Sequence, residues 1–323
     1  MKACWITHEG AESRFDVRDT PVPEPKAGEV RIRVRASALN RGEIMGSVGI
    51  HAGDPPRVGG TEASGEVDAL GPGVADVRIG DRVFGRARGG FAEFAILPLA
   101  ELVPMPARLT FEKAAAIPIA YYTAHDMIRT WGRLQAGEWL LVTGASSGVG
   151  VACIQIARLM DARTIATSGS ADKLGRLRAL GLDVGLQTRA PDFAGWVREA
   201  TDGHGADLVI NNVGGTVFAE CIRSMAYRGR LATVGYVDGS VTAQIDLSAV
   251  HQHCLEIFGV SNKLRTPEMK ARTVAGFRQD LLPAFADGRL EPVIDKIFAF
   301  EDIAAAKAHM DANRHVGKIV VRL

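Results

Sequence analysis

Residues 139–150 read Trp-Leu-Leu-Val-Thr-Gly-Ala-Ser-Ser-Gly-Val-Gly, and an apolar run to Met160 and a short β-type run, Arg163–Ser168, follow them. This order predicts a strand, a glycine-rich turn, a helix and a second strand, which make one βαβ unit. Glycine suits such a turn because it lets the backbone turn tightly and approach a ligand closely. The amide groups near Gly148 and Gly150, at the helix start, lack intrahelical partners and can hold a diphosphate. The stretch therefore predicts a nucleotide-binding turn; the alternative is a turn that serves only helix–strand packing.

The composition is that of a globular protein. With 323 residues the chain can form two domains of ordinary size. Its net charge is +1 and it has no basic run, so we expect no nucleic-acid partner. No apolar segment approaches the ~20 residues that span a bilayer, and the N-terminus lacks the apolar core of a signal peptide, so we expect no membrane partner. A reducing, cytoplasmic location is expected because the cysteines form no CxxC pair: Cys4, Cys153, Cys221 and Cys254.

The first hundred residues are rich in β-type patterns. Val30, Ile32 and Val34 alternate with arginines, which predicts a half-buried strand with one solvated face. Turn patterns recur at short intervals, as at Gly59-Gly60 and Gly89-Gly90, with short apolar runs between them. This region therefore predicts a small barrel or sandwich.

From residue 139 to about 260, predicted strands alternate with predicted helices. Such alternation implies a parallel, doubly wound sheet. The tail, 265–323, is expected to return to the first domain. The main predicted elements are helices Phe111–Ala116, Ala171–Leu180 and Thr216–Met225, strands Ala206–Val213, Leu231–Tyr236 and Leu255–Val260 (the last a core strand), and in the tail a helix opened by Thr266-Pro267, a second around Asp302–Asp311 and the strand Lys318–Leu323.

Several short segments occur in a characteristic order along the whole chain: Ala38-Leu39-Asn40, Gly60-Thr61-Glu62-Ala63-Ser64-Gly65, Gly80-Asp81-Arg82-Val83, Gly90-Phe91-Ala92-Glu93, Leu141–Gly150, Gly229-Arg230-Leu231 and Gly317-Lys318-Ile319-Val320. In order and spacing they resemble the medium-chain dehydrogenase/reductase superfamily, in its zinc-free, quinone oxidoreductase-like branch. The resemblance implies an α/β chain with a GroES-like β-rich catalytic domain (1–120 and 265–323) and a Rossmann NADP-binding domain with a doubly wound parallel sheet (121–264). It also implies an active site in the cleft between the domains and a homodimer.

Two positions separate this chain from the zinc-dependent alcohol dehydrogenases. Those enzymes carry a cysteine and a histidine where this chain has Asn40 and Thr61, and neither is an effective zinc ligand. The family's four-cysteine structural zinc lobe is also absent. The segment His251-Gln252-His253-Cys254 is the nearest metal-like group, but surface or packing histidines are commoner than sites. Without zinc, no Lewis acid stabilises an alkoxide, so we expect no metal and little alcohol oxidation.

The chemistry that suits such a site is NADPH-dependent hydride transfer to a small-molecule electrophile, a quinone or an enone. The carbonyl oxygen that gains charge needs a positioned hydrogen-bond donor. We expect Asn40 to be that donor because its amide donates without titrating; Thr61, Arg41 and Tyr122 are weaker candidates. Alternatives remain open: Asn40 as a loop residue that bonds its own backbone, Tyr122 as a core aromatic, and a chain that binds NADPH as a sensor or structural protein, or acts like an alcohol dehydrogenase.

Cofactor choice is predicted from the end of the second strand. NAD-binding folds usually carry an acidic residue there, about 20 residues after the glycine turn, and this chain has Ser168. In the family, a serine and a lysine at positions matching Ser168 and Lys173 accompany NADPH, although Lys173 as a solvated helix residue is an alternative. A tyrosine that often completes the pocket is matched by Thr188, with Arg189 adjacent. Gly169, Ser170 and Lys173 can donate to a 2′-phosphate.

The resemblance implies further contacts along the cofactor. Doubly wound sheets place their ligands at the C-terminal ends of strands. The glycine turn is expected to contact the cofactor through Ala145, Ser146, Ser147, Gly148, Val149 and Gly150. The nicotinamide end is expected at Thr123, Asn211, Val213, Gly214, Gly235, Tyr236, Phe258 and Val260. The loop Gly46–Pro56 and the segment 236–250 are expected to line the substrate pocket.

Overall fold

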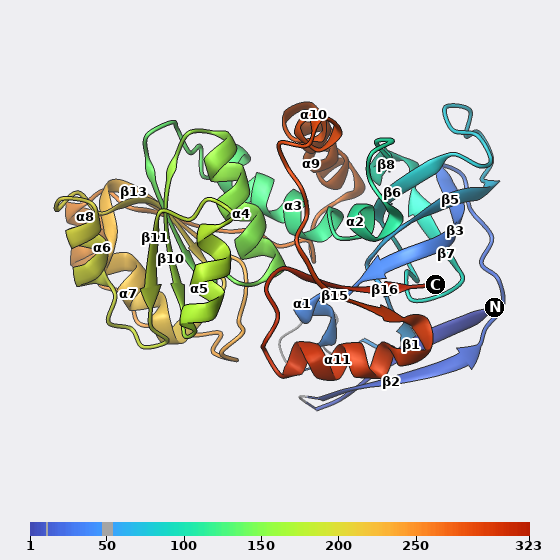
Figure 1. Ribbon diagram of the computed structural model, residues 1–323, viewed down its shortest axis with the longest axis horizontal. Helices are drawn as coiled ribbons and strands as arrows, with labels where there is room; N and C mark the ends of the chain where they lie inside the picture. Colours follow the sequence, from blue (N-terminus) through green and yellow to red (C-terminus); the bar gives the residue numbers. More distant parts are fainter. Residues whose placement is uncertain (11, 47–53) are drawn as a thin grey trace. The chain divides into compact units, whose positions relative to one another are not determined.

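The computed structural model describes residues 1–10, 12–46 and 54–323, which form two compact units (Figure 1). The first unit comprises Met1–Tyr122 and Asn262–Leu323, and the second comprises Thr123–Ser261. Among the described residues, no helix is both long and apolar enough to cross a bilayer.

The first unit is built on two β-sheets. The larger has the strand order β15-β16-β3-β5-β6-β8, with β7 also paired to β3, and the smaller has the order β2-β1-β4. Only β15 and β16 pair in parallel among these described strands. The strands are β1 Lys2–Glu9, β2 Glu12–Asp19, β3 Glu29–Ala38, β4 Arg57–Val58, β5 Glu62–Leu70, β6 Arg82–Arg86, β7 Phe94–Pro98, β8 Leu102–Pro104, β15 Ile294–Ala299 and β16 Lys318–Arg322.

Strand β3 shows why this sequence forms a sheet with one wet face. Val30, Ile32 and Val34 are buried in a core cluster. The arginines that alternate with them face outward: Arg31 is half-buried, and Arg33 and Arg35 are exposed. The predicted half-buried strand is confirmed. At its far end β3 pairs with β16, and Val320 lies opposite Ala38.

Short helices complete the first unit. Thr110 caps α2, because its hydroxyl accepts from the amide of Lys113, and Thr266 caps α9 in the same way with Pro267 in the first turn. The helices are α1 Arg41–Ile44, α2 Phe111–Ala115, α3 Pro118–His125 (whose last residues belong to the second unit), α9 Pro267–Asp280, α10 Leu282–Asp287 and α11 Ile303–Asp311, with 3₁₀ turns Leu99–Glu101 and Phe300–Asp302.

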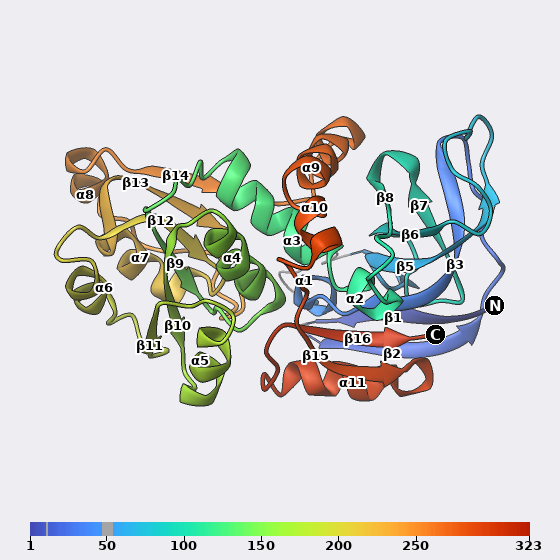
Figure 2. The same ribbon diagram turned by 45° about the horizontal axis from the view of Figure 1, so that its top comes forward.

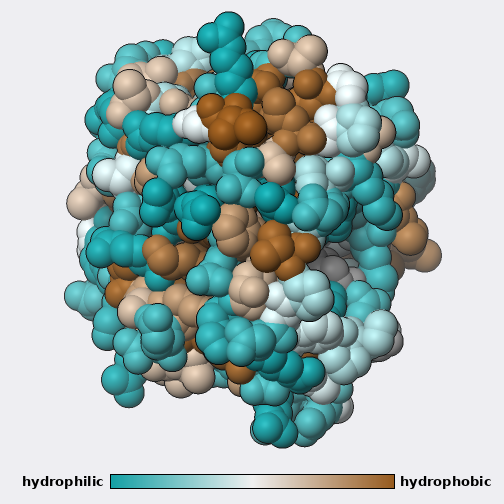
Figure 3. Space-filling view, turned by 90° about the vertical axis from the view of Figure 1, so that its right-hand side faces the viewer, coloured by the Kyte–Doolittle hydropathy of each residue, from teal (hydrophilic) through white to brown (hydrophobic). Residues whose placement is uncertain are grey.

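The face seen in Figure 3 is largely hydrophilic, with apolar side chains in several separate groups.

The second unit is a six-stranded parallel sheet in the order β11-β10-β9-β12-β13-β14. Numbered from β9, this is the doubly wound order 3-2-1-4-5-6, so the predicted sheet is confirmed. Figures 1 and 2 show α4 and α5 on one face of it and α6 and α7 on the other. The strands are β9 Trp139–Thr143, β10 Arg163–Ser168, β11 Val184–Gln187, β12 Ala206–Asn211, β13 Met225–Thr233 and β14 Glu256–Gly259; the helices are α4 Gly148–Leu159, α5 Ala171–Arg178, α6 Ala194–Ala200, α7 Phe218–Arg223 and α8 Leu247–Gln252, with a π-helical turn Asp126–Thr130 and a 3₁₀ turn Gly215–Val217.

Three predicted elements of the second unit need correction. The predicted helix Thr216–Met225 is a 3₁₀ turn followed by the shorter α7. The predicted strand Leu231–Tyr236 is β13, which begins at Met225 because its first residues pair with β12. The predicted core strand Leu255–Val260 is β14, and it is largely exposed, with Ile257 39% accessible. It lies at the end of the strand order and so pairs on one side only.

Candidate functional site

The glycine turn after β9 has a geometry that few other residues could adopt. Gly144 has a φ of +59°, in the left-handed region that favours glycine. Ser147 caps α4, because its hydroxyl accepts from the amide of Gly150 at 3.1 Å. A Cβ on Gly150 would lie 2.5 Å from the carbonyl oxygen of Ala145, so the helix approaches the turn too closely for a side chain there. The turn is therefore shaped by the chain itself, as a backbone cradle for phosphate requires.

The end of β10 gathers hydroxyl groups and a lysine beside this turn. Ser170 caps α5 by accepting from the amide of Lys173, and the hydroxyl of Ser168 accepts from the amide of Ser170 at 3.4 Å. The Lys173 ammonium lies 3.4 Å from the hydroxyl of Ser146 in the glycine turn. The structure thus brings these four expected cofactor residues together.

Thr188 and Arg189 follow β11 and differ in what they contact. The hydroxyl of Thr188 donates to the Asp192 carboxylate at 2.7 Å and accepts from the amide of Ala190, so it belongs to its own turn. The side chain of Arg189 lies directly on Gly169, because a Cβ on Gly169 would come within 2.1 Å of the Arg189 Nε. The structure therefore places the Arg189 side chain on Gly169, which is one of the expected cofactor residues; the sequence indicated this only through the position of Arg189 next to Thr188.

Asn211, at the end of β12, is fully buried and tied within its own turn. Its Oδ1 accepts from the Thr143 hydroxyl and from the amides of Val213 and Gly214, at 3.0 to 3.1 Å. Its Nδ2 donates to the Gly214 carbonyl at 2.9 Å. Asn211 therefore shapes the turn, and the groups that this turn can offer a ligand belong to the residues after it.

The other positions expected near the nicotinamide lie along the second unit. Gly235 and Tyr236 follow β13; Tyr236 is 36% exposed, and a Cβ on Gly235 would lie 2.8 Å from the carbonyl oxygen of Asn212. Phe258 is half-buried on β14, and Val260 just after it is buried, as is Thr123 in α3. The C-terminal ends of β12, β13 and β14 share one edge of the sheet with the glycine turn, since all its strands are parallel.

A buried polar cluster, here the Glu62 cluster (Asn40, Thr61, Glu62 and Lys318), lies in the first unit. The Glu62 side chain is fully buried. Its Oε1 accepts from Asn40 Nδ2 and from the Lys318 ammonium, both at 2.8 Å. Its Oε2 accepts from the amide of Ile119 in α3 at 2.7 Å. Lys318, 6% exposed, also donates to Asn40 Oδ1 at 2.7 Å and to the Leu39 carbonyl at 2.9 Å, so the charge of Glu62 is fully compensated.

The orientation of the Asn40 amide follows from its two charged neighbours. Its oxygen faces the Lys318 ammonium and its nitrogen faces the Glu62 carboxylate; a flipped amide would place like groups together. The second Asn40 hydrogen has only longer contacts, at 3.3 Å to the Thr61 hydroxyl and 3.4 Å to the Ala38 carbonyl. One hydrogen of the expected donor is therefore committed to Glu62, and the other is weakly held.

Thr61 is fixed from the other side by Glu43. Its hydroxyl donates to Glu43 Oε2 at 3.1 Å, and Glu43 Oε1 accepts from the amide of Gly60 at 2.7 Å and from Arg57 at 3.2 Å. Glu43 is fully buried, so these bonds satisfy a carboxylate that has lost its water.

Tyr122 is a core residue of the first unit. Its side chain is fully buried against Phe277, with ring centroids 4.7 Å apart, and the Arg86 guanidinium lies 5.2 Å from its ring centroid. Burial raises the pKa of the Tyr122 phenol far above its usual range. Its hydroxyl has no hydrogen-bond partner among the described residues. These facts favour the core interpretation of Tyr122. Arg86 itself donates to Glu101 at 3.0 Å and to Asn262 at 3.1 Å.

Among the described residues, no three His, Cys, Asp or Glu side chains converge in a way that could hold a metal ion. Within the His251–Cys254 segment, the Cys254 thiol contacts the Tyr227 hydroxyl at 3.8 Å and is exposed. The expected substrate loop Gly46–Pro56 falls mostly on residues 47–53, which lie outside the described residues.

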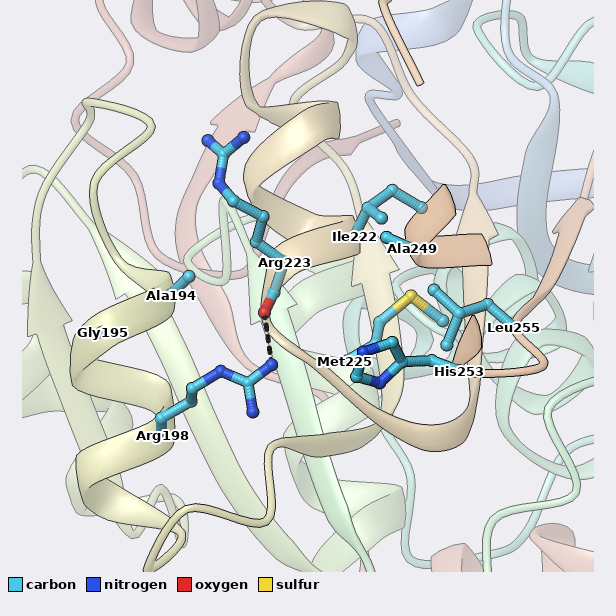
Figure 4. Close-up of a pocket in the computed structure, with 9 residues that line it drawn as sticks. All are labelled: Ala194, Gly195, Arg198, Ile222, Arg223, Met225, Ala249, His253 and Leu255. Carbon is cyan, nitrogen blue, oxygen red and sulfur yellow. Dashed lines mark hydrogen bonds between the residues drawn. The ribbon is translucent and has the colours of Figure 1, made fainter. Parts of the chain in front are cut away.

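A cavity of about 300 Å³ in the second unit has a different location from the glycine turn (Figure 4). Met225 begins β13 and Leu255 precedes β14, so the cavity lies at the N-terminal ends of these strands, whereas the turn follows the C-terminal end of β9. Arg198 donates to the backbone carbonyl of Arg223 at its wall, at 3.1 Å. This cavity is not the expected cofactor site.

Comparisons with known proteins agree with this architecture. Residues 26–107 match the alcohol dehydrogenase GroES-like domain, and residues 148–274 match the family described as zinc-binding dehydrogenase. A quinone oxidoreductase-like protein 2 homolog of Nematostella vectensis is 29% identical over 91% of this chain and 81% of its own length. The chain is also 31% identical to a polyketide synthase subunit of Mycobacterium tuberculosis, but it spans only 14% of that protein's length.

Several solved structures match over the full length of both chains. A mycobacterial protein determined in complex with NADPH has a TM-score of 0.91 at 28% identity. A structure described as an NAD-dependent alcohol dehydrogenase has a TM-score of 0.87 at 34% identity. With the matched domains and the observed fold, this full-length similarity shows that the chain belongs to the medium-chain dehydrogenase/reductase superfamily.

Proposed function

We propose that this chain is an NADPH-dependent, zinc-independent oxidoreductase that transfers hydride to a quinone or another activated double bond such as an enone. The observation that carries the proposal is the Glu62 cluster. Where zinc-dependent alcohol dehydrogenases carry a cysteine and a histidine, this chain has Asn40 and Thr61. Asn40 donates to the Glu62 carboxylate, which the Lys318 ammonium compensates, and to the hydroxyl of Thr61, which itself donates to Glu43. Amide and hydroxyl groups are poor zinc ligands but good hydrogen-bond donors to a carbonyl oxygen.

The second unit (121–264 in the proposed domain division) would bind the cofactor, and its residues fit a phosphorylated dinucleotide. The glycine turn provides a phosphate cradle, and Ser168 stands where NAD-binding folds usually carry a carboxylate. Lys173 adds a positive charge there. When bound, the dihydronicotinamide supplies the hydride. The mycobacterial relative determined with NADPH supports this choice of cofactor.

The Asn40 amide is the proposed donor to the substrate's carbonyl oxygen. Its hydrogen towards Glu62 is held at 2.8 Å, whereas the contacts to Thr61 and Ala38 are 3.3 and 3.4 Å and can be exchanged for a substrate oxygen. Because the Lys318 ammonium binds Asn40 Oδ1, it polarises the amide and strengthens its N–H as a donor. The enolate formed when hydride adds to the electron-poor carbon then takes a proton from water.

The same cluster also motivates a second candidate function. Each ammonium hydrogen of Lys318 already has an acceptor without any substrate, namely Leu39, Asn40 or Glu62. A sensor or structural protein that binds NADPH with little turnover would have such a self-contained cluster. The two functions differ in whether NADPH is consumed.

The deciding experiment follows NADPH oxidation by absorbance against a panel of quinones, enones and alkyl aldehydes, with and without chelator. We expect turnover of quinones or enones that survives the chelator. We also expect Asn40→Ala to lower kcat by about 10²- to 10³-fold, the usual effect of losing one oxyanion donor. Loss of activity with chelator would contradict zinc independence. Tight NADPH binding without consumption would favour the sensor function.

We further propose that the protein is a homodimer formed through β14 and that it works in the cytoplasm, where its free cysteines would stay reduced. β14 ends the strand order of its sheet and exposes Ile257, and a second copy could extend the sheet there. Light scattering should give twice the chain mass for the wild type and the monomer mass for Ile257→Lys. A monomeric wild type would contradict the dimer.

A further inference from the structure

We propose that Arg189 binds the 2′-phosphate of the cofactor and thereby sets the preference for NADPH over NADH. The inference rests on the proposed function in one respect, since it assumes that the second unit binds a nicotinamide dinucleotide. It assigns to Arg189 the role that a tyrosine at the position of Thr188 would have by resemblance. Thr188 cannot take that role because its hydroxyl is bound to Asp192 and Ala190.

The position of Arg189 carries the inference. The ribose 2′-position of a bound dinucleotide is recognised at the residue about 20 positions after the glycine turn, at the end of the second strand of the fold. Here that strand is β10, which ends at Ser168, and the Arg189 side chain covers the next residue, Gly169. Its Nε, Cγ and Cδ atoms would lie 2.1 to 2.7 Å from a Cβ on Gly169, so any larger residue at this position would displace the arginine from where it lies.

The charges around this position suit a phosphate. Within the part of the chain that the structure describes, no hydrogen bond or ion pair engages the exposed Arg189 guanidinium. Lys173, on α5, extends its ammonium to Ser146 in the glycine turn. Of the nearby carboxylates, Asp192 already accepts from Thr188, and Asp172 lies in the first turn of α5. A guanidinium binds phosphate through two parallel hydrogen bonds, which an ammonium cannot do.

A competing role for Arg189 is to stack on the adenine ring. Stacking would stabilise NADH and NADPH equally, because both carry the same adenine. Phosphate binding would stabilise NADPH alone. The difference in affinity between the two cofactors therefore separates these roles.

The experiment measures binding by calorimetry, with NADPH and NADH and with the fragments adenosine 2′,5′-bisphosphate and adenosine 5′-monophosphate. The variants are Arg189→Ala, Arg189→Lys and Gly169→Ala; the last keeps the charge but displaces the guanidinium, because the new Cβ overlaps it. Arg163→Ala is the matched control: it removes an exposed arginine from the first residue of the same strand, where the guanidinium lies over the Trp139 ring.

We expect Arg189→Ala to lower the affinity for NADPH and for the bisphosphate by about tenfold to a hundredfold, which is the effect of losing a charge-assisted hydrogen bond. The affinities for NADH and the monophosphate should stay unchanged. Arg189→Lys and Gly169→Ala should show smaller losses of the same kind, and Arg163→Ala none. Higher salt should reduce the difference in NADPH affinity between the wild type and Arg189→Ala.

Each other outcome has a distinct meaning. If the wild type binds NADPH and Arg189→Ala binds it equally well, the inference is wrong while the proposed function stands. If Arg189→Ala weakens NADH as much as NADPH, Arg189 contacts the adenine and the inference is again wrong. If the wild type binds neither dinucleotide, the proposed function fails and the inference falls with it.

Discussion

Replacing Lys318 by methionine removes the cation of the Glu62 cluster but keeps an unbranched side chain of similar length. The Glu62 carboxylate, fully buried, then loses its charged partner, and the oxygens of Asn40 and Leu39 lose their donor. Removing one partner of a buried ion pair costs about 3–5 kcal/mol. In a domain of this size each kcal/mol shifts the melting temperature by about 2–4 °C, so we expect Lys318→Met to unfold about 6–20 °C below the wild type.

The assay is thermal unfolding followed by circular dichroism, with Lys307→Met as the matched control. Lys307 pairs with Asp311 on the surface of α11, and an exposed pair of this kind contributes less than about 1 kcal/mol. The double variant Lys318→Met/Glu62→Gln should regain much of the loss, because it leaves no buried charge without a partner. The reasoning is refuted if Lys318→Met is no less stable than Lys307→Met, or if the double variant is no more stable than Lys318→Met.

Three further predictions concern other parts of the chain. Gly150→Ala should weaken NADPH binding at least tenfold, because the new Cβ would lie 2.5 Å from the Ala145 carbonyl oxygen and displace the turn; calorimetry that finds wild-type affinity would contradict this. The pKa of the Glu291 carboxyl is lowered by a hydrogen bond from Lys113, so its contribution to stability is full above the ordinary value of 4.5 and is lost as the pH falls through the folded value. Glu291→Gln should therefore lower the free energy of unfolding by less than about 1 kcal/mol at neutral pH and leave it unchanged in strong acid. If urea unfolding in acid still finds the variant less stable than the wild type, the pairing with Lys113 is not the cause. An alkylating reagent should modify only Cys254 in the native protein, because Cys254 is exposed and the other three cysteines are buried. Burial raises the pKa of the Cys4 thiol to about 12 and the pKa values of the Cys153 and Cys221 thiols still higher. Mass spectrometry that finds adducts on these three thiols in the native protein would contradict this prediction.

The parts of the fold that follow from local sequence could be predicted. The run from Trp139 to Ser168 contains its own strand, turn and helix, so the βαβ unit and the doubly wound sheet that continues it are confirmed. Strands whose bounds or burial depend on their neighbours in the sheet could be predicted less well. The start of β13 reads Met-Ala-Tyr-Arg-Gly-Arg, which has no strand pattern of its own, and it is extended because β12 lies beside it. The apolar β14 predicts burial, but its place at the sheet edge decides its exposure.

In the candidate site, too, some features follow from local sequence and others from long-range pairing. The sequence predicts Asn40 as a donor to the substrate, from its amide group and its place in the segment Ala38-Leu39-Asn40. Its hydrogen bonds depend on Lys318, which lies 278 positions away and reaches Asn40 only because β16 pairs with β3. Arg189 could not be placed from sequence either, since its contact with Gly169 joins the loops after two neighbouring strands of the parallel sheet. Long-range pairing therefore sets what these side chains can do.

The pairing of β16 with β3 also has a consequence for biosynthesis. The second unit is continuous, Thr123–Ser261, so it can fold on the ribosome while the last part of the first unit is still being made. The first unit must wait, because β16 and its Lys318 are translated long after β3, Asn40 and Glu62. Until then the nascent sheet holds an acidic side chain without its cation, and the Ala36–Ala38 end of β3 lacks its partner strand. Unpaired strand segments of this kind make a nascent chain prone to aggregate.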